Sequence, residues 1–152
     1  MLRRYEGWHP IVRDLIEAFP ETFIWALHDR AELPQWTESR ITLLGDACHP
    51  MLPFMAQGAC QAIEDAAVLT RCIHECGGAV REALVRYEAA RCPRASGIQA
   101  RSWDNCTTYH LPDGDAQRAR DASYASAVDR GSALGAFDWL YGHDASSVPL
   151  PA

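Results

Sequence analysis

One continuous segment, Leu43 to Leu69, constrains the fold of this chain more than any other part of the sequence. It reads LLGDACHPMLPFMAQGACQAIEDAAVL: a short apolar run ends in Gly45-Asp46, a loop with two prolines follows, and small residues then recur at helical spacing. A buried strand that ends in Gly-Asp places a carboxylate at the carboxyl edge of a sheet, where open α/β sheets bind their ligands. The segment therefore predicts a strand, a stiff loop and a helix arranged around a ligand.

The residue types in this segment favour a ligand that has hydroxyl groups and a planar or anionic part. The carboxylate of Asp46 is a good acceptor for sugar or ribityl hydroxyl groups, and Gly45 permits a close approach of the backbone. The first N–H groups of a helix are unpaired and partly positive, and Gly58 leaves them uncovered by a side chain. The spacing alone leaves a second interpretation open, in which Gly45-Asp46 is only a turn between a strand and a loop.

The rest of the chain predicts few strands and many helices. Apolar periodicity and the positions of proline and glycine give, in chain order, a helix at His9–Phe19, strands at Thr22–Leu27 and Arg40–Leu44, a helix from Gln57 or Gly58 to Cys76, a helix at Ala79–Arg91, a continuation at Ile98–Tyr109 and a weak helix at Asp115–Val128. The segment His28–Ser39 is expected to be a loop, and Pro93 is expected to kink or end the helix before it. Two strands do not form a stable sheet alone, which indicates that the chain lacks a partner.

The composition limits the partners and the location of the protein. Its 152 residues suffice for about one domain, and the formal net charge of -6 argues against general binding to nucleic acid. No apolar run is long enough to span a membrane, and Arg3 and Arg4 are not followed by the apolar stretch of a signal peptide, so we expect a cytoplasmic protein. The 6 cysteines include no CxxC pair and are expected to be reduced.

Two polar clusters on the first long predicted helix favour structural interpretations. Cys72 and Cys76 would share one helix face, but His74 would point away and no second ligand cluster follows, so a metal site is disfavoured. The adjacent acids Glu64 and Asp65 would point in different directions. We interpret them as first-turn acids favoured by the helix dipole, and not as a catalytic pair.

Several stretches together carry a resemblance that covers nearly the whole chain. Leu43–Leu69 resembles the second FAD-binding motif of the single-component FAD-dependent aromatic hydroxylases, in the variant of the salicylate hydroxylase-like members. The flanks that agree are YEGWHP at Tyr5–Pro10, RYEAARCPRA at Arg86–Ala95, YHLPDG at Tyr109–Gly114 and DWLYGHDA at Asp138–Ala145. The resemblance implies a monooxygenase that uses FAD, NAD(P)H and O2 to hydroxylate a small aromatic substrate.

The resemblance also implies roles for individual residues of the motif. The acid after the glycine would hold the ribityl chain of the flavin, the two prolines would lie beside the isoalloxazine ring, and the backbone at the helix start would meet its pyrimidine edge. A helix N-terminus at that edge would stabilise negative charge without a mobile side chain. The implied cofactor-binding residues are Gly45, Asp46, Pro50, Pro53, Gln57, Gly58 and Ala59.

The same loop is expected to face the substrate through Phe54 and Met55. Some members of the family carry a histidine at the position of Phe54, and that histidine is linked to phenolic substrates. Phe54 itself offers no proton acceptor. His49 fits the motif and is interpreted as a packed loop histidine, so we name no catalytic acid or base.

The implied fold class is an α/β fragment, mostly helical, made of the last strands and C-terminal helices of a Rossmann-like FAD-binding domain. Residues 1–38 would end the substrate domain and return to the FAD domain, residues 39–108 would form the C-terminal part of the FAD-binding domain, and residues 109–152 would be a tail packed on it. The dinucleotide fingerprint GxGxxG is absent. A partner segment that carries this fingerprint is therefore expected N-terminal to the chain.

Two other interpretations stay open. In the first, the chain is a truncated, non-catalytic remnant or an interaction fragment that uses exposed apolar surface. In the second, it belongs to another enzyme of the same flavoprotein fold, such as a halogenase or an epoxidase. The YHLPDG and DWLYG stretches argue against this last interpretation.

Overall fold

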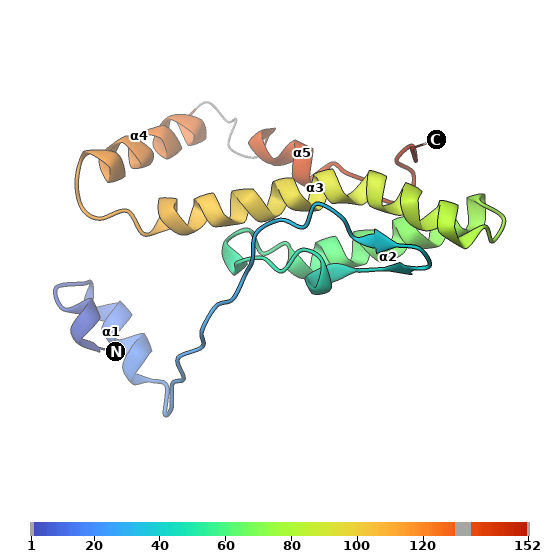
Figure 1. The fold of residues 1–152 in the computed structure, drawn as a ribbon. Helices are drawn as coiled ribbons and strands as arrows, with labels where there is room; N and C mark the ends of the chain where they lie inside the picture. Colours follow the sequence, from blue (N-terminus) through green and yellow to red (C-terminus); the bar gives the residue numbers. More distant parts are fainter. Residues whose placement is uncertain (1, 130–134, 152) are drawn as a thin grey trace.

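Two long helices form the body of the molecule in the computed structural model, which describes residues 2–129 and 135–151 (Figure 1). The helices α2 (Gly58–Glu75) and α3 (Val80–Tyr109) lie side by side as a hairpin, and the loop that precedes α2 runs along them. The core lies where these elements meet. Its buried members are Trp36, Cys48, Val68, Cys72, Ala83, Tyr87, Ala95 and Ala145.

The helix α2 confirms the helix predicted from the small-residue pattern. Its buried residues recur every three or four positions, as a helix with one covered face requires, and they are Gln61, Asp65, Val68 and Cys72. The helix ends where Gly77 and Gly78 take positive φ angles of 54° and 87°. Glycine reaches this conformation without a steric penalty, so the pair turns the chain into α3.

The helix α3 is longer than predicted, because it passes through Pro93 without ending. The continuation expected at Ile98–Tyr109 is confirmed, and of the two alternatives for Pro93 the end of the helix is wrong. The proline side chain is exposed, while Tyr87 before it and Ile98 after it are completely buried. Proline lacks an N–H group and therefore weakens the helix at this point. The packing of the helix on both sides of Pro93 compensates for this loss.

A small hairpin precedes the functional loop. Its strands β1 (Thr37–Glu38) and β2 (Ile41–Thr42) pair antiparallel, with Thr37 opposite Thr42. The expected loop at His28–Ser39 thus contains a strand, and the expected buried strand at Arg40–Leu44 is only two residues long. The side chain of Ile41 is 72% exposed, because no described element covers that face of the hairpin.

The N-terminal part stands apart from the helical hairpin (Figure 1). It consists of a 3-10 turn, η1 (Leu2–Tyr5), and the helix α1 (Pro10–Glu17), which confirms the predicted first helix. The strand predicted at Thr22–Leu27 is wrong, since these residues have no strand partner among the residues that the structure describes. A strand needs a hydrogen-bonded neighbour, and propensity alone does not supply one.

The C-terminal part runs back along the outside of α3 (Figure 1). It contains α4 (Asp115–Asp129), the 3-10 turn η4 (Gly135–Phe137) and the short helix α5 (Asp138–Tyr141), and α4 confirms the weak helix predicted there. Arg94 holds the end of α5 by donating to the carbonyl oxygens of Trp139 and Leu140, at 3.1 and 3.0 Å. Among the described helices, none is both long enough and apolar enough to cross a bilayer. All 6 cysteines are free, as expected.

Candidate functional site

The turn at Gly45 brings the functional loop close against α2. Gly45 is buried and has a φ of 61°, and a Cβ atom placed on it would stand 3.1 Å from the Cβ of Ala62. Both the left-handed backbone and the close contact require glycine at this position. The residues Gly45–Ala47 form the 3-10 turn η2, which follows the hairpin and presents Asp46 at its middle.

The carboxylate of Asp46 lies at the start of α2 and is exposed to solvent. Its Oδ1 atom is 3.8 Å from the position that a Cβ atom would take on Gly58. Within residues 2–129 and 135–151 the structure gives this side chain no hydrogen bond and no ion pair. The unpaired carboxylate of Asp46 therefore lies beside the first residue of α2, which is a glycine and has no side chain.

The start of α2 has no side-chain cap. The N-cap residue, Gln57, makes no capping hydrogen bond, and its amide oxygen instead accepts from Gln61 Nε2 at 3.1 Å. Gln57 is buried, whereas Ala59 is exposed. The first N–H groups of a helix have no intrahelical partner and carry partial positive charge. The site therefore combines an exposed carboxylate with uncapped backbone donors.

The loop between these two features is held by three polar side chains of α3. All three donate to backbone carbonyl oxygens of the loop. Gln99 Nε2 donates to the carbonyl oxygen of Pro50 at 2.8 Å, and Asn105 Nδ2 donates to the carbonyl oxygen of Phe54 at 3.2 Å. Between them, the hydroxyl group of Ser102 donates to the carbonyl oxygen of Leu52. The turn η3 (Pro53–Met55) lies in this part of the loop. The spacing of three between Gln99, Ser102 and Asn105 places them on one helix face, and this polar stripe is the sequence signal that the prediction missed.

Phe54 points toward the end of α3. Its ring centroid is 6.1 Å from that of Tyr109 and 5.4 Å from that of His110, and both pairs are close to perpendicular. The imidazole of His110 is therefore the polar ring beside Phe54, which itself offers no proton acceptor. His110 Nδ1 is 2.7 Å from the carbonyl oxygen of Cys106, so Nδ1 carries the proton and Nε2 is the acceptor of the neutral ring.

A buried carboxylate, Asp65, fixes the turn from behind. Its Oδ2 atom accepts from the backbone N–H of Gly45 at 3.0 Å and from His49 Nε2 at 2.7 Å, and its Oδ1 atom accepts from Arg91 Nε at 2.8 Å. Asp65 and His49 have no solvent exposure, and Arg91 has 1%. The carboxylate of Asp65 and the Nε2 atom of His49 are thus paired, as their desolvation requires, whereas the buried Nδ1 atom of His49 has no hydrogen-bond partner among the described residues. The interpretation of His49 as a packed loop residue agrees with this position.

The network extends from Asp65 to the surface through Glu64. Arg91 Nη1 donates to Glu64 Oε2 at 2.7 Å, and Arg94 Nε donates to the same oxygen at 2.8 Å. The interpretation of Glu64 and Asp65 as first-turn acids is wrong, because α2 begins at Gly58 and both acids lie beyond its first turn. Their partners come from α3, and sequence spacing within one helix could not reveal them.

The environment of Asp65 shifts its titration. Burial raises the pKa of its carboxyl group, but the hydrogen bonds from His49 and Arg91 outweigh burial and hold the pKa below its usual value. A depressed pKa in the folded state means that the unfolded chain takes up the proton first as the pH falls. The ionised form of Asp65 therefore stabilises the fold at neutral pH.

We expect acid to destabilise the protein through this group. The contribution of Asp65 should be complete well above about pH 4, the usual pKa of an unfolded aspartate, and should be lost as the pH falls through that value toward the folded-state pKa. Urea unfolding followed by circular dichroism between about pH 3 and pH 7 measures it. The Asp65→Asn variant should show a weaker pH dependence in the same range. A wild-type stability that rises on acidification would contradict the assignment.

Cys48, His49 and Asp65 place three potential metal ligands within 4.8 Å of one another. Their atoms are already used within the protein, because Asp65 accepts from three donors and Cys48 Sγ donates to the carbonyl oxygen of Gly45 at 3.3 Å. Burial and the charge of Asp65 raise the pKa of the Cys48 thiol to about 12. The thiol therefore stays protonated, and the cluster serves to hold the turn.

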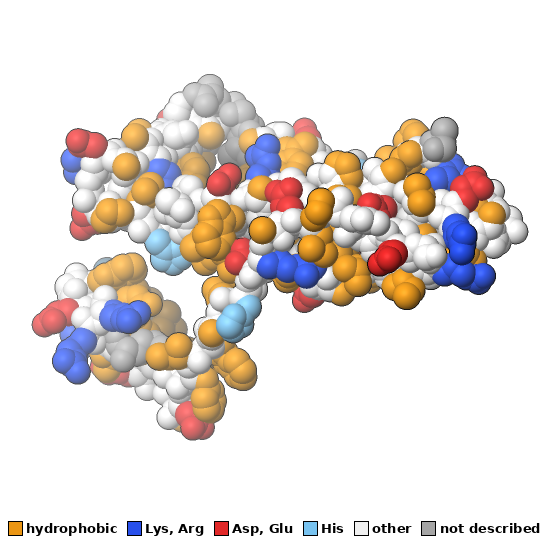
Figure 2. All heavy atoms as spheres, viewed as in Figure 1, with side chains coloured by type: hydrophobic (Ala, Val, Ile, Leu, Met, Phe, Trp, Pro, Cys, Tyr) orange, Lys and Arg blue, Asp and Glu red, His pale blue; other side chains and the backbone are white. Residues whose placement is uncertain are grey.

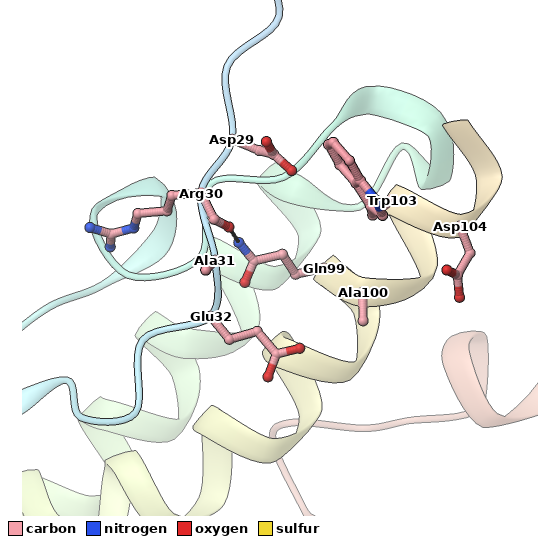
Figure 3. A pocket seen from close by; sticks show the side chains of 8 residues that line it. All are labelled: Asp29, Arg30, Ala31, Glu32, Gln99, Ala100, Trp103 and Asp104. Atoms are coloured by element: carbon pink, nitrogen blue, oxygen red, sulfur yellow. Dashed lines mark hydrogen bonds between the residues drawn. The ribbon is translucent and has the colours of Figure 1, made fainter. Parts of the chain in front are cut away.

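A pocket lies on the other side of the loop, between the segment Asp29–Glu32 and α3 (Figure 3). Its lining residues are Asp29, Arg30, Ala31, Glu32, Gln99, Ala100, Trp103 and Asp104. None of the predicted flavin-contacting residues is among them. Gln99 joins the two places, since its Nε2 donates both to the carbonyl oxygen of Arg30 at 2.9 Å, drawn in Figure 3, and to that of Pro50.

The structure brings Gly45 and Asp46 against α2, since a Cβ atom on Gly45 would meet Ala62 and the carboxylate of Asp46 lies beside Gly58. The turn η3 is tied instead to α3, through the contacts of Asn105 with Phe54 and Met55. The glycine turn, the exposed acid and the uncapped helix start therefore lie in one part of the fold. The kind of domain follows from the sequence family. A family model described as "FAD binding domain" matches residues 12–102, and the chain belongs to this family.

The curated relatives of the chain have the names of aromatic monooxygenases. The chain is 43% identical over 144 residues to 3-amino-4-hydroxybenzoate 2-monooxygenase PtnB3 of Streptomyces platensis, covering 95% of this chain and 35% of that protein. It is 42% identical over 151 residues to 6-hydroxynicotinate 3-monooxygenase of Pseudomonas fluorescens, covering 99% and 33%. The chain therefore spans about a third of the length of the curated relatives that it matches.

Solved structures agree with these relatives. A salicylate hydroxylase substrate complex superposes with a TM-score of 0.76 at 26% identity, covering 95% of this chain and 34% of that one. A variant of Klebsiella pneumoniae HpxO complexed with FAD gives a TM-score of 0.76 at 30% identity, covering 90% and 36%. The resemblance to the salicylate hydroxylase-like flavoproteins and the predicted fold class, a mostly helical fragment of the FAD-binding hydroxylase fold, are confirmed.

Proposed function

We propose that this chain forms the flavin-contacting wall of an FAD-dependent monooxygenase that hydroxylates a small aromatic compound with NAD(P)H and O2. The observation that carries the proposal is the exposed, unpaired carboxylate of Asp46 beside the uncapped start of α2. FAD would supply the redox chemistry. The chain's own residues would bind and orient the flavin and shape the substrate side.

The local geometry fits the flavin end of FAD. Asp46 is free to accept from ribityl hydroxyl groups, and a side chain on Gly58 would fill the space next to it. The backbone N–H groups at Gly58 and Ala59 would face the electron-rich pyrimidine edge of the ring. The loop with Pro50 and Pro53 would lie beside the ring, held in place by α3.

The substrate would lie on the side of the loop that carries Phe54 and Met55. Asn105 Nδ2 fixes both residues, because it is 3.2 Å from the carbonyl oxygen of Phe54 and 3.0 Å from the sulfur of Met55. A rigid apolar wall at this place would position an aromatic ring and exclude water. The names of the relatives specify aromatic substrates. For this chain we propose the same class, a small aromatic compound.

The ADP half of FAD needs residues that this chain does not contain. We propose that a segment with the GxGxxG fingerprint supplies them, in a cytoplasmic enzyme whose total length is that of the relatives. Within the present chain, residues 1–38 would belong to the return from the substrate domain, residues 39–108 to the FAD-binding domain, and residues 109–152 to its tail. The rival interpretation, an interaction fragment without activity of its own, gains support from the exposed apolar N-terminal part.

Flavin retention by variants of Asp46 tests the proposed function. Replacing Asp46 with alanine should weaken FAD binding about 10- to 100-fold, because hydrogen bonds to a charged acceptor are worth about 1.5–3 kcal/mol. The stability should stay unchanged, since the side chain is exposed and unpaired. Fluorescence titration with FAD, combined with urea unfolding, measures both quantities.

The matched control is Glu82→Ala, which removes an exposed acid from the first turn of α3. This variant changes the net charge by the same amount as Asp46→Ala and should leave FAD binding intact. Equal affinities for the wild type and the Asp46→Ala variant would remove Asp46 from the flavin site.

A further inference from the structure

The C-terminal end of α3 places a histidine ring against the apolar turn η3. The ring centroid of His110 lies 5.4 Å from that of Phe54, and the two rings are inclined by 79°. The ring of Tyr109 packs on the same phenyl ring, with centroids 6.1 Å apart. On the face of the molecule that Figure 2 shows, a histidine side chain lies next to hydrophobic side chains where α3 ends. A polar, exposed ring thus borders the wall that is proposed to face the substrate.

The end of the helix determines which ring nitrogen of His110 is available. His110 is the C-cap residue of α3, and its backbone N–H donates to the carbonyl oxygen of Thr107 at 3.2 Å. Its Nδ1 atom donates to the carbonyl oxygen of Cys106 at 2.7 Å, one of the last carbonyl groups, which have no partner within a helix. The Nε2 atom has no hydrogen-bond partner within residues 2–129 and 135–151. The lone pair on Nε2 is therefore free for a ligand.

The other polar groups beside Phe54 are poorer proton acceptors than an imidazole. Asn105 contributes an amide, whose Nδ2 atom is already 3.2 Å from the carbonyl oxygen of Phe54. Tyr109 contributes a phenolic hydroxyl group, which binds an added proton far more weakly than an imidazole does. Imidazole is the side chain that takes up and releases a proton in the neutral pH range. Among the groups that contact Phe54, His110 is therefore the one suited to accept a proton.

The charged side chains around this end of α3 are paired with one another. Arg120 of α4 pairs with Asp121 at 2.7 Å, and Asp115 pairs with Arg118 at 2.6 Å. Asp113, in the turn that follows α3, is exposed. The turn η3 consists of a proline, a phenylalanine and a methionine, so it contributes no charge. A positive charge formed on the imidazole would therefore be balanced best by an anion that the ligand itself supplies.

We propose that His110 Nε2 binds a ring hydroxyl group of the aromatic substrate and accepts its proton, so that the site selects aromatic compounds with an ionisable hydroxyl group. In this step the O–H bond of the substrate breaks and an N–H bond forms at Nε2. The electron pair stays on the oxygen as a phenolate, and no oxidant or reductant takes part. The inference rests on the proposed function, in which Phe54 and Met55 face the substrate.

The geometry at η3 supports this step. Aromatic rings that pack on one another have centroids about 4.5–7 Å apart, so a substrate ring on Phe54 would be as close to it as His110 is. A hydroxyl group on that ring would come within hydrogen-bond reach of Nε2, as a proton acceptor requires. The C-terminal end of a helix carries partial negative charge, which stabilises an imidazolium placed there. A site that binds a hydroxyl group in this way discriminates against analogues that lack it.

The test compares two probes on the complete 152-residue chain in the absence of FAD. The first, para-nitrophenol, has an ionisable hydroxyl group and a yellow phenolate form. The second, para-nitroanisole, has a methoxy group in its place. Affinities are measured by equilibrium dialysis at probe concentrations up to millimolar, at a slightly acidic pH where free para-nitrophenol is mostly neutral. We expect the chain to bind both rings, and the bound para-nitrophenol to show the absorbance of the phenolate.

Replacing His110 with glutamine should weaken the binding of para-nitrophenol roughly tenfold or more, because a hydrogen bond between charged groups is lost. The yellow colour of the bound probe should disappear, while the affinity for para-nitroanisole should stay unchanged. A merely structural role of His110 would weaken both probes alike, as Phe54→Ala is expected to do. The matched control, His74→Gln, removes an exposed histidine from the last turn of α2 and should change neither affinity.

The ring nitrogen chemical shifts of isotope-labelled histidine give a second readout. The signal of His110, identified by its absence from the His110→Gln variant, should show a proton on Nδ1 alone and should change to the doubly protonated ring when para-nitrophenol is added. A ring that stays neutral, an equal loss of both probes in His110→Gln, or a chain that binds neither probe would overturn the proposal. Because FAD is absent throughout, loss of flavin binding in the Asp46→Ala variant stays a separate result.

Discussion

Replacing Asp65 with alanine is expected to lower the free energy of unfolding by about 3–5 kcal/mol, the range for breaking a buried ion pair on one side. The carboxylate accepts from the backbone N–H of Gly45, from His49 Nε2 and from Arg91 Nε, and all three donors would lose this acceptor. The change would leave the guanidinium of Arg91 buried beside an unfilled space. Urea unfolding at neutral pH gives the difference.

The control for this prediction is Glu75→Ala. Glu75 is 41% exposed and lies 3.6 Å from Arg71 and 3.4 Å from Arg86. Exposed ion pairs contribute about 0–1 kcal/mol, so its loss should be small. If the two variants unfold at the same urea concentration, the network around Asp65 does not hold the turn as described.

The second large effect is expected from Gly45→Val. The backbone at Gly45 has a φ of 61°, and the added Cβ would stand 3.1 Å from the Cβ of Ala62. A β-branched residue in this conformation costs about 1–3 kcal/mol, and the overpacking costs about as much again. We therefore expect a loss of about 2–6 kcal/mol in the free energy of unfolding. FAD binding should also be lost, because η2 must move.

The matched glycine is Gly97 on α3. It is exposed, has an ordinary helical backbone, and nothing stands within 4 Å of an added Cβ. The Gly97→Ala variant should therefore gain about 0.5–1 kcal/mol from helix propensity. The two glycines are expected to respond with opposite signs, and a stabilising Gly45→Val change would contradict the geometry of the turn.

The helical part of the fold could be predicted because its signals are local. The start of α2 at Gly58 and its end before Gly77-Gly78 follow from small residues, periodicity and glycine. Thr22–Leu27 was predicted as a strand on equally local grounds, and it is not one here. Strand formation depends on a neighbour, and the described chain brings none to this segment.

In the candidate site, too, local features could be predicted and contacts between distant residues could not. The tight turn at Gly45 and the exposed acid Asp46 could be predicted from the Gly-Asp pair, because both depend only on neighbouring residues. The pairing of Asp65 with Arg91 could not, since the two residues lie on different helices and are separated by 26 positions. Only the packing of α2 on α3 brings a buried acid and a buried base together.

The most direct test of the central claim is a binding comparison between FAD, riboflavin and ADP on the 152-residue chain. The chain is proposed to contact the ribityl group and the ring of the flavin, and not the ADP half. Riboflavin, followed by fluorescence, should therefore bind within about tenfold of FAD, a difference of 1.4 kcal/mol or less, and ADP should not displace either. Displacement of FAD by ADP, with no binding of riboflavin, would contradict the account.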